Sequence, residues 1–142
     1  MMHDIELLQY VYKTADMGCV GIDSVISKTR NATLENELQK QYSEYKKLRG
    51  EARTLLEARN EFPKGVGAVS KASADVMTVS KMMVDHTDSK IAEMSIQGNQ
   101  IGINKTIKHL HDYNGQSTEV RTLAEKLLAT EEANAEQLKR FL

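Results

Sequence analysis

The sequence predicts an all-α fold: an up-down four-helix bundle with a long connection between the second and third helices that carries a short extra helix. In four stretches of the 142-residue chain, apolar residues recur at alternating steps of three and four, the spacing of a helix with one buried face. Short polar turns divide these stretches into two pairs, and the chain contains one proline. So few helix breakers favour helices over strands. We expect residues 1–142 to form a single domain.

The first helix is predicted over residues 4–28. Its seam, the line of residues that faces the other helices, consists of Leu8, Tyr12, Ala15, Cys19, Ile22 and Ile26. Gly18 and Gly21 also lie in this helix, and each weakens an isolated helix by about 1 kcal/mol relative to alanine. We therefore expect these glycines to allow the close approach of a neighbouring helix. Residues 29–33 form the turn, in which Asn31 or Thr33 caps the next helix.

The second helix is predicted over residues 34–61. Its seam consists of Leu34, Leu38, Gln41, Tyr45, Leu48, Ala52 and Leu55. Pro63 ends this helix, because the residue before a proline is pushed away from helical geometry. We expect a short helix over residues 68–84 and a break at the polar cluster 85–89, with one bent helix as the alternative. Four methionines of this region either cover an end of the bundle or form a dimer surface: Met77, Met82, Met83 and Met94.

The third and fourth helices are predicted over residues 89–113 and 117–142. Asn114 and Gly115 indicate the turn between them, and Ser117 is a suitable cap for the fourth helix. The seam of the third helix consists of Ile96, Gln100, Ile103, Ile107 and Leu110. The seam of the fourth helix consists of Val120, Ala124, Leu127, Glu131, Asn134, Leu138 and Phe141.

Several residues on or beside these seams are polar. At a rise of about 1.5 Å per residue, their distances from the two turns place them within about one helical turn of each other. They form the candidate site, which consists of Cys19, Gln41, Glu44, Gln100, Glu131 and Asn134. Buried polar groups cost free energy unless they are paired. The layer is therefore either a hydrogen-bonded network that fixes the helix register or the remains of a ligand site.

The polar layer resembles that of the ferritin-like family, which includes the rubrerythrins and bacterioferritins. That family takes one Glu from each of the first and third helices and a Glu-x-x-His pair from each of the second and fourth. The positions that correspond here are Cys19 and Gln100, then Gln41 and Glu44, then Glu131 and Asn134. The resemblance implies a degenerate di-metal site, because two carboxylates without histidine leave most of the positive charge of two iron ions uncompensated. No cofactor is expected, and iron or manganese is the alternative.

Composition and charge exclude several classes of function. The 19 basic and 20 acidic residues give a net charge of -1 without a basic block, which argues against nucleic acid as a partner. The lack of a long apolar run, of a signal peptide and of a second cysteine predicts a cytoplasmic protein without a membrane span. We expect a non-enzymatic bundle that acts as a homo-oligomer, with a dimer favoured, or that binds a partner protein. The alternative is an atypical metal-binding or oxidoreductase protein that uses Glu44 and Glu131.

Overall fold

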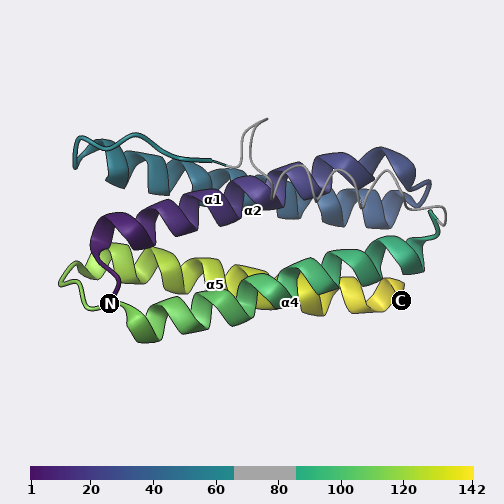
Figure 1. Ribbon diagram of the computed structural model, residues 1–142. Coiled ribbons are helices and arrows are strands. Elements are labelled where there is room, and N and C mark those ends of the chain that lie inside the picture. Colours follow the sequence, from purple (N-terminus) through teal and green to yellow (C-terminus); the bar gives the residue numbers. More distant parts are fainter. Residues whose placement is uncertain (66–85) are drawn as a thin grey trace.

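The computed structural model describes residues 1–65 and 86–142, and this part of the chain is all-α, as predicted (Figure 1). Its helices are α1 (Asp4–Val25), α2 (Ala32–Glu57), α4 (Asp88–Asp112) and α5 (Thr118–Leu138). Short 3-10 turns extend α1 over Ile26–Lys28 and α5 over Lys139–Phe141. No strand occurs among the described residues, where an isolated bridge joins Met2 to Tyr113. None of the described helices is both long and apolar enough to cross a membrane.

The four helices form two pairs. The helix α1 packs along α2, and α4 packs along α5 (Figure 1). The predicted seams of the first, second and fourth helices are buried between the pairs, apart from three half-buried residues near helix ends: Ile26, Leu55 and Phe141. These three seams are therefore largely confirmed, and they bring the polar residues of α2 and α5 into the interior.

Hydrogen bonds at the helix starts join the two pairs. The Asn31 side-chain oxygen caps α2 by accepting from the backbone N–H groups of Thr33 and Leu34, at 2.9 and 3.2 Å. The Asn31 amide nitrogen donates to Asp88, in the first turn of α4, at 2.8 Å. The Thr29 hydroxyl donates to the other oxygen of Asp88 at 2.9 Å. The turn between α1 and α2 is therefore attached to the start of α4.

The helix α2 ends four residues before its predicted end. Asn60 has a positive φ of 59°, and its N–H donates to the Glu57 carbonyl at 3.0 Å. The N–H of Glu61 donates to the Leu56 carbonyl, also at 3.0 Å. This pair of bonds is a Schellman motif, which asparagine tolerates because it enters the left-handed region more readily than most residues. Asn60, and not Pro63, ends the helix.

The predicted seam of the third helix was correct only in part: Ile103 is buried, and Ile96 and Leu110 are half-buried against the core. Gln100 and Ile107 are exposed. The buried residues of α4 are Ile91, Ala92, Asn99, Gly102, Ile103 and Thr106. The prediction followed the isoleucines, whereas the interior takes polar Asn99 and Thr106 because both have partners there: the Thr106 hydroxyl, for example, lies 2.9 Å from the Tyr10 hydroxyl. Polar residues with partners can therefore replace apolar ones on a buried face.

The connection between the pairs is described only at its two ends. The short helix predicted over residues 68–84 and three of the four methionines, Met77, Met82 and Met83, lie outside the described residues. The fourth, Met94, is half-buried against the core. The helix α4 begins inside the predicted polar cluster, where the Thr87 hydroxyl accepts from the Lys90 N–H at 3.2 Å.

Candidate functional site

A tyrosine, a carboxyl group and an amide meet between the helix pairs. The Tyr45 hydroxyl lies 3.0 Å from Glu131 Oε2 and 3.0 Å from Asn99 Oδ1. These residues come from α2, α5 and α4, and all are buried, with Glu131 only 3 % exposed. A hydroxyl has one hydrogen and can donate to only one of the two oxygens at a time. A bond to Glu131 ties α2 to α5, and a bond to Asn99 ties α2 to α4.

Two glycines make room for this contact. A Cβ atom on Gly102 would lie 2.4 Å from Glu131 Oε1 and 2.6 Å from Oε2. A Cβ atom on Gly18 would lie 2.6 Å from the ring of Tyr45. Both distances are far below van der Waals contact. The expectation that a glycine of the first helix allows a close approach is confirmed for Gly18, which the Tyr45 ring approaches.

Burial controls the ionisation of the two titratable groups in this contact, Glu131 and Tyr45. Burial raises the pKa of the Glu131 carboxyl from its ordinary 4.5 to about 7, although the hydrogen bond from Tyr45 acts in the opposite direction. Burial, followed by the charge of Glu131, raises the pKa of Tyr45 well above its ordinary value of 10. Among the described residues, Glu131 Oε1 has no hydrogen-bond partner, and no ion pair includes Glu131. The carboxyl therefore sits in the interior without a cation.

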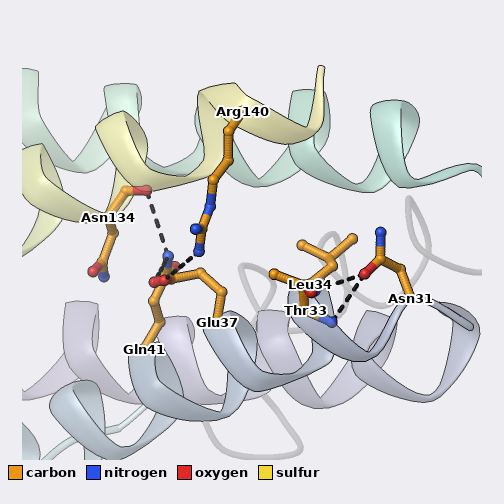
Figure 2. A network of polar contacts seen from close by, with 7 residues as sticks. All are labelled: Asn31, Thr33, Leu34, Glu37, Gln41, Asn134 and Arg140. Atoms are coloured by element: carbon orange, nitrogen blue, oxygen red, sulfur yellow. Dashed lines mark hydrogen bonds and ion pairs between the residues drawn. The ribbon is translucent and has the colours of Figure 1, made fainter.

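A second polar group lies beside the first and has a different character. The Gln41 amide nitrogen donates to Glu37 Oε2 at 2.9 Å and to the Asn134 backbone carbonyl at 3.4 Å. Arg140 reaches down from the 3-10 turn after α5, and its guanidinium lies 3.2 Å from Glu37 Oε1 (Figure 2). The carboxylate of Glu37 is thus buried but paired with a cation, which offsets its loss of hydration.

The structure brings together only part of the predicted site. Gln41, Glu131 and Asn134 are buried in these two groups, each 2–3 % exposed. Cys19 is buried on α1, and burial raises the pKa of its thiol. Glu44 is half-buried, and no hydrogen bond among the described residues joins it to Glu131. Gln100 was placed in the layer wrongly: it is exposed and bonds to an exposed neighbour on its own helix.

Four polar members of these groups were not predicted from the sequence, and one of them is Arg140. Tyr45 was assigned to the seam as a core residue, without a role for its hydroxyl. Glu37 lies four residues before Gln41, so the helical spacing already placed the two side chains on one face. Asn99 gave no such signal, because it directly precedes Gln100, which was assigned to the seam.

The donor set does not fit the two metal ions that the ferritin-like resemblance implies. Nowhere in residues 1–65 and 86–142 do three or more His, Cys, Asp or Glu side chains form a group that could hold a metal. The acidic group in the first contact is Glu131, whose neighbours are a hydroxyl and an amide. Those groups stabilise a carboxyl by hydrogen bonding and add no negative charge for a divalent cation.

The fold places the chain in a class of all-α proteins made of packed helical pairs. A DUF305 fragment from Deinococcus radiodurans shares it with a TM-score of 0.75 and 13 % identity, over 96 % of this chain and 93 % of that chain. A conserved hypothetical protein from Mycobacterium tuberculosis shares it with a TM-score of 0.76 and 13 % identity, over 98 % and 96 %. No family model matches the sequence, and no curated protein is significantly similar to it. At 13 % identity the likeness shows the fold alone.

The resemblance to the ferritin-like family is therefore wrong. The chain instead shares its helical fold with the DUF305 fragment and with the conserved hypothetical protein. The resemblance depended on a polar layer with contributions from all four helices. One of those residues, Gln100, lies on the surface, and the interior carboxyl of Glu131 contacts Tyr45, which the resemblance did not use.

Proposed function

We propose that this protein is a non-enzymatic helical bundle, with its two pairs in an up-down arrangement, that acts by self-association or by binding a partner protein. The observation that supports the proposal is the burial of Gln41, Glu131 and Asn134, which leaves their side chains almost no surface for a substrate. Enzymes bind small molecules in concave, accessible sites. In this chain the candidate polar side chains lie between the helices, where they affect how the helices pack.

The outer face of α4 offers a surface for such an interaction. Ile101, near the middle of α4, is 58 % exposed. Gly98 lies one turn before it, and a Cβ atom there would meet no other atom within 4 Å. We propose that an apolar side chain of another molecule packs against Ile101 in the open space over Gly98. We favour a second copy of this chain as the partner.

Size-exclusion chromatography with light scattering tests the proposal. The wild-type protein should have the mass of a dimer, and Ile101→Lys should shift it to the monomer while its far-UV circular dichroism remains that of a folded helical protein. Ala129→Lys adds the same charge at an exposed position of α5 and should stay a dimer. A wild-type protein that is monomeric at every concentration, and that recovers no partner after cross-linking, would refute the proposal.

Metal analysis separates this proposal from the metal-dependent alternative, which uses Glu44 and Glu131. Protein from cells grown with iron and manganese should contain far less than one equivalent of either metal. Its melting temperature should not rise when iron is added, because a bound metal stabilises the folded state by mass action. A stoichiometric metal content that Glu131→Gln abolishes would overturn the non-enzymatic assignment.

A further inference from the structure

A single carboxyl group lies at the centre of a line of contacts through all four described helices. The ring of Tyr45 on α2 fills the space over Gly18 on α1, and the Tyr45 hydroxyl contacts Glu131 on α5. The carboxyl of Glu131 in turn fills the space over Gly102 on α4. Moving Glu131 therefore changes the contacts between both helix pairs.

The groups around this carboxyl do not neutralise its charge. Tyr45 and Asn99 face it from α2 and α4, and both are uncharged. Tyr10 on α1 is close enough for the charge of Glu131 to contribute to its raised pKa, which is due mainly to burial. Glu44 adds a second negative charge near Tyr45. An ionised Glu131 is thus a buried charge that the Tyr45 hydroxyl stabilises only in part.

We propose that Glu131 acts as a pH-sensitive joint between the two helix pairs. The protonated carboxyl is neutral and allows the pairs to close around it. The ionised carboxyl favours a looser arrangement in which water reaches the gap between Tyr45 and Gly102. The proposal concerns the interior of one chain and does not depend on the oligomeric state.

The direction of the pH effect follows from the raised pKa of a carboxyl group. Glu131 releases its proton near pH 4.5 when hydrated and near pH 7 in the closed structure. Between these values the closed form keeps a proton that the open form has lost, so rising pH favours opening. Below this window both forms are protonated and above it both are ionised, and the equilibrium stops changing. From about pH 5 to pH 8 the ratio of the open form to the closed form rises by about a hundredfold.

Hydrogen exchange measured by mass spectrometry tests the joint. The wild-type protein is compared at each pH with Glu131→Gln, which keeps the size of the side chain but cannot ionise. For peptides around residues 99–106 and 131–134, the ratio of wild-type to variant opening should rise by up to about a hundredfold from pH 5 to pH 8. Glu132→Gln, at the exposed neighbouring position, should behave like the wild type.

A second measurement keeps the proposal testable if Glu131→Gln does not fold. Carbon NMR of the labelled wild-type protein follows the Glu131 carboxyl directly as the pH is changed. A titration midpoint near 7, with simultaneous changes at Tyr45 and Gly102, supports the joint. A midpoint near 4.5, or equal pH dependence of exchange in the wild type and in Glu131→Gln, would overturn it.

Discussion

Replacing Gly102 by alanine tests the close contact between α4 and α5. Glycine in a helix interior is about 1 kcal/mol less favourable than alanine, so the substitution alone should stabilise a helix. At Gly102, however, the new methyl group would lie 2.4 Å from Glu131 Oε1 and 2.8 Å from its Cδ. The carboxyl ends a flexible side chain, which at an exposed position would simply move aside. Here Glu131 is 3 % exposed and held by Tyr45, so it has no free space to enter.

The balance of these effects predicts a net loss of stability. Overpacking a filled interior costs about 1–3 kcal/mol. A displaced carboxyl also loses the Tyr45 hydrogen bond, which contributes about 1 kcal/mol. Subtracting the helix gain of about 1 kcal/mol leaves a destabilisation of about 1–3 kcal/mol. For a chain of this size, each kcal/mol lowers the melting temperature by about 4 °C.

Gly98 provides the matched control, because it lies one turn earlier in the same helix and faces open space. Gly98→Ala should stabilise the protein by about 0.5–1 kcal/mol. Urea unfolding followed by far-UV circular dichroism gives both values. In a Glu131→Ala background the clash disappears, so Gly102→Ala should become neutral or stabilising there. If Gly102→Ala is as stable as Gly98→Ala in the wild-type background, the tight contact between Gly102 and Glu131 does not exist.

Three further substitutions probe the polar groups and a fourth, Gln100→Ala, is a control; urea unfolding measures each. Tyr45→Phe keeps the ring over Gly18 but should lower the free energy of unfolding by about 1–3 kcal/mol, because the hydroxyl is lost. It should also raise the pKa of Glu131 further, which carboxyl NMR detects. An unchanged pKa would contradict the hydrogen bond. Asn99→Ala should lower the free energy of unfolding by about 1–2 kcal/mol, whereas Gln100→Ala should change it by less than about 0.5 kcal/mol. A larger loss for Gln100→Ala than for Asn99→Ala would mean that Gln100, as first predicted, faces the interior. Arg140→Ala removes the cation that pairs with buried Glu37 and should lower the free energy of unfolding by about 1–3 kcal/mol.

The sequence patterns predicted the fold well where apolar side chains decide burial. In the first, second and fourth helices, leucines and alanines recur with the helical period, and burial of apolar surface makes that pattern reliable. Ser117 was recognised as a cap, and Asn31 was one of two candidates with Thr33, because each precedes a periodic stretch. The end of α2 was misplaced because proline is an obvious breaker, whereas the left-handed conformation of Asn60 is not apparent from its identity.

The candidate site was predicted only in part, because polar burial depends on partners that are distant in sequence. Glu131 and Asn134 were found because they interrupt an otherwise apolar seam. Asn99 is buried because Tyr45, 54 positions away, supplies a hydroxyl. Such a partner is invisible to a periodicity analysis. The row with Ile96, Ile103 and Ile107 therefore appeared to be the better interior face, although Ile107 is exposed.

The bond between Asn31 and Asp88 places two helix starts side by side. Each helix N-terminus carries a partial positive charge of about half an elementary charge, so α2 and α4 repel each other where they begin. Asp88 lies in the first turn of α4 and bonds to the residues that precede α2, Thr29 and Asn31. One carboxylate thus compensates the dipoles of two helices that belong to different pairs. Neutralising it exposes both dipoles at once, so the docking of the pairs depends on a charge at the end of the molecule as well as on the interior contacts.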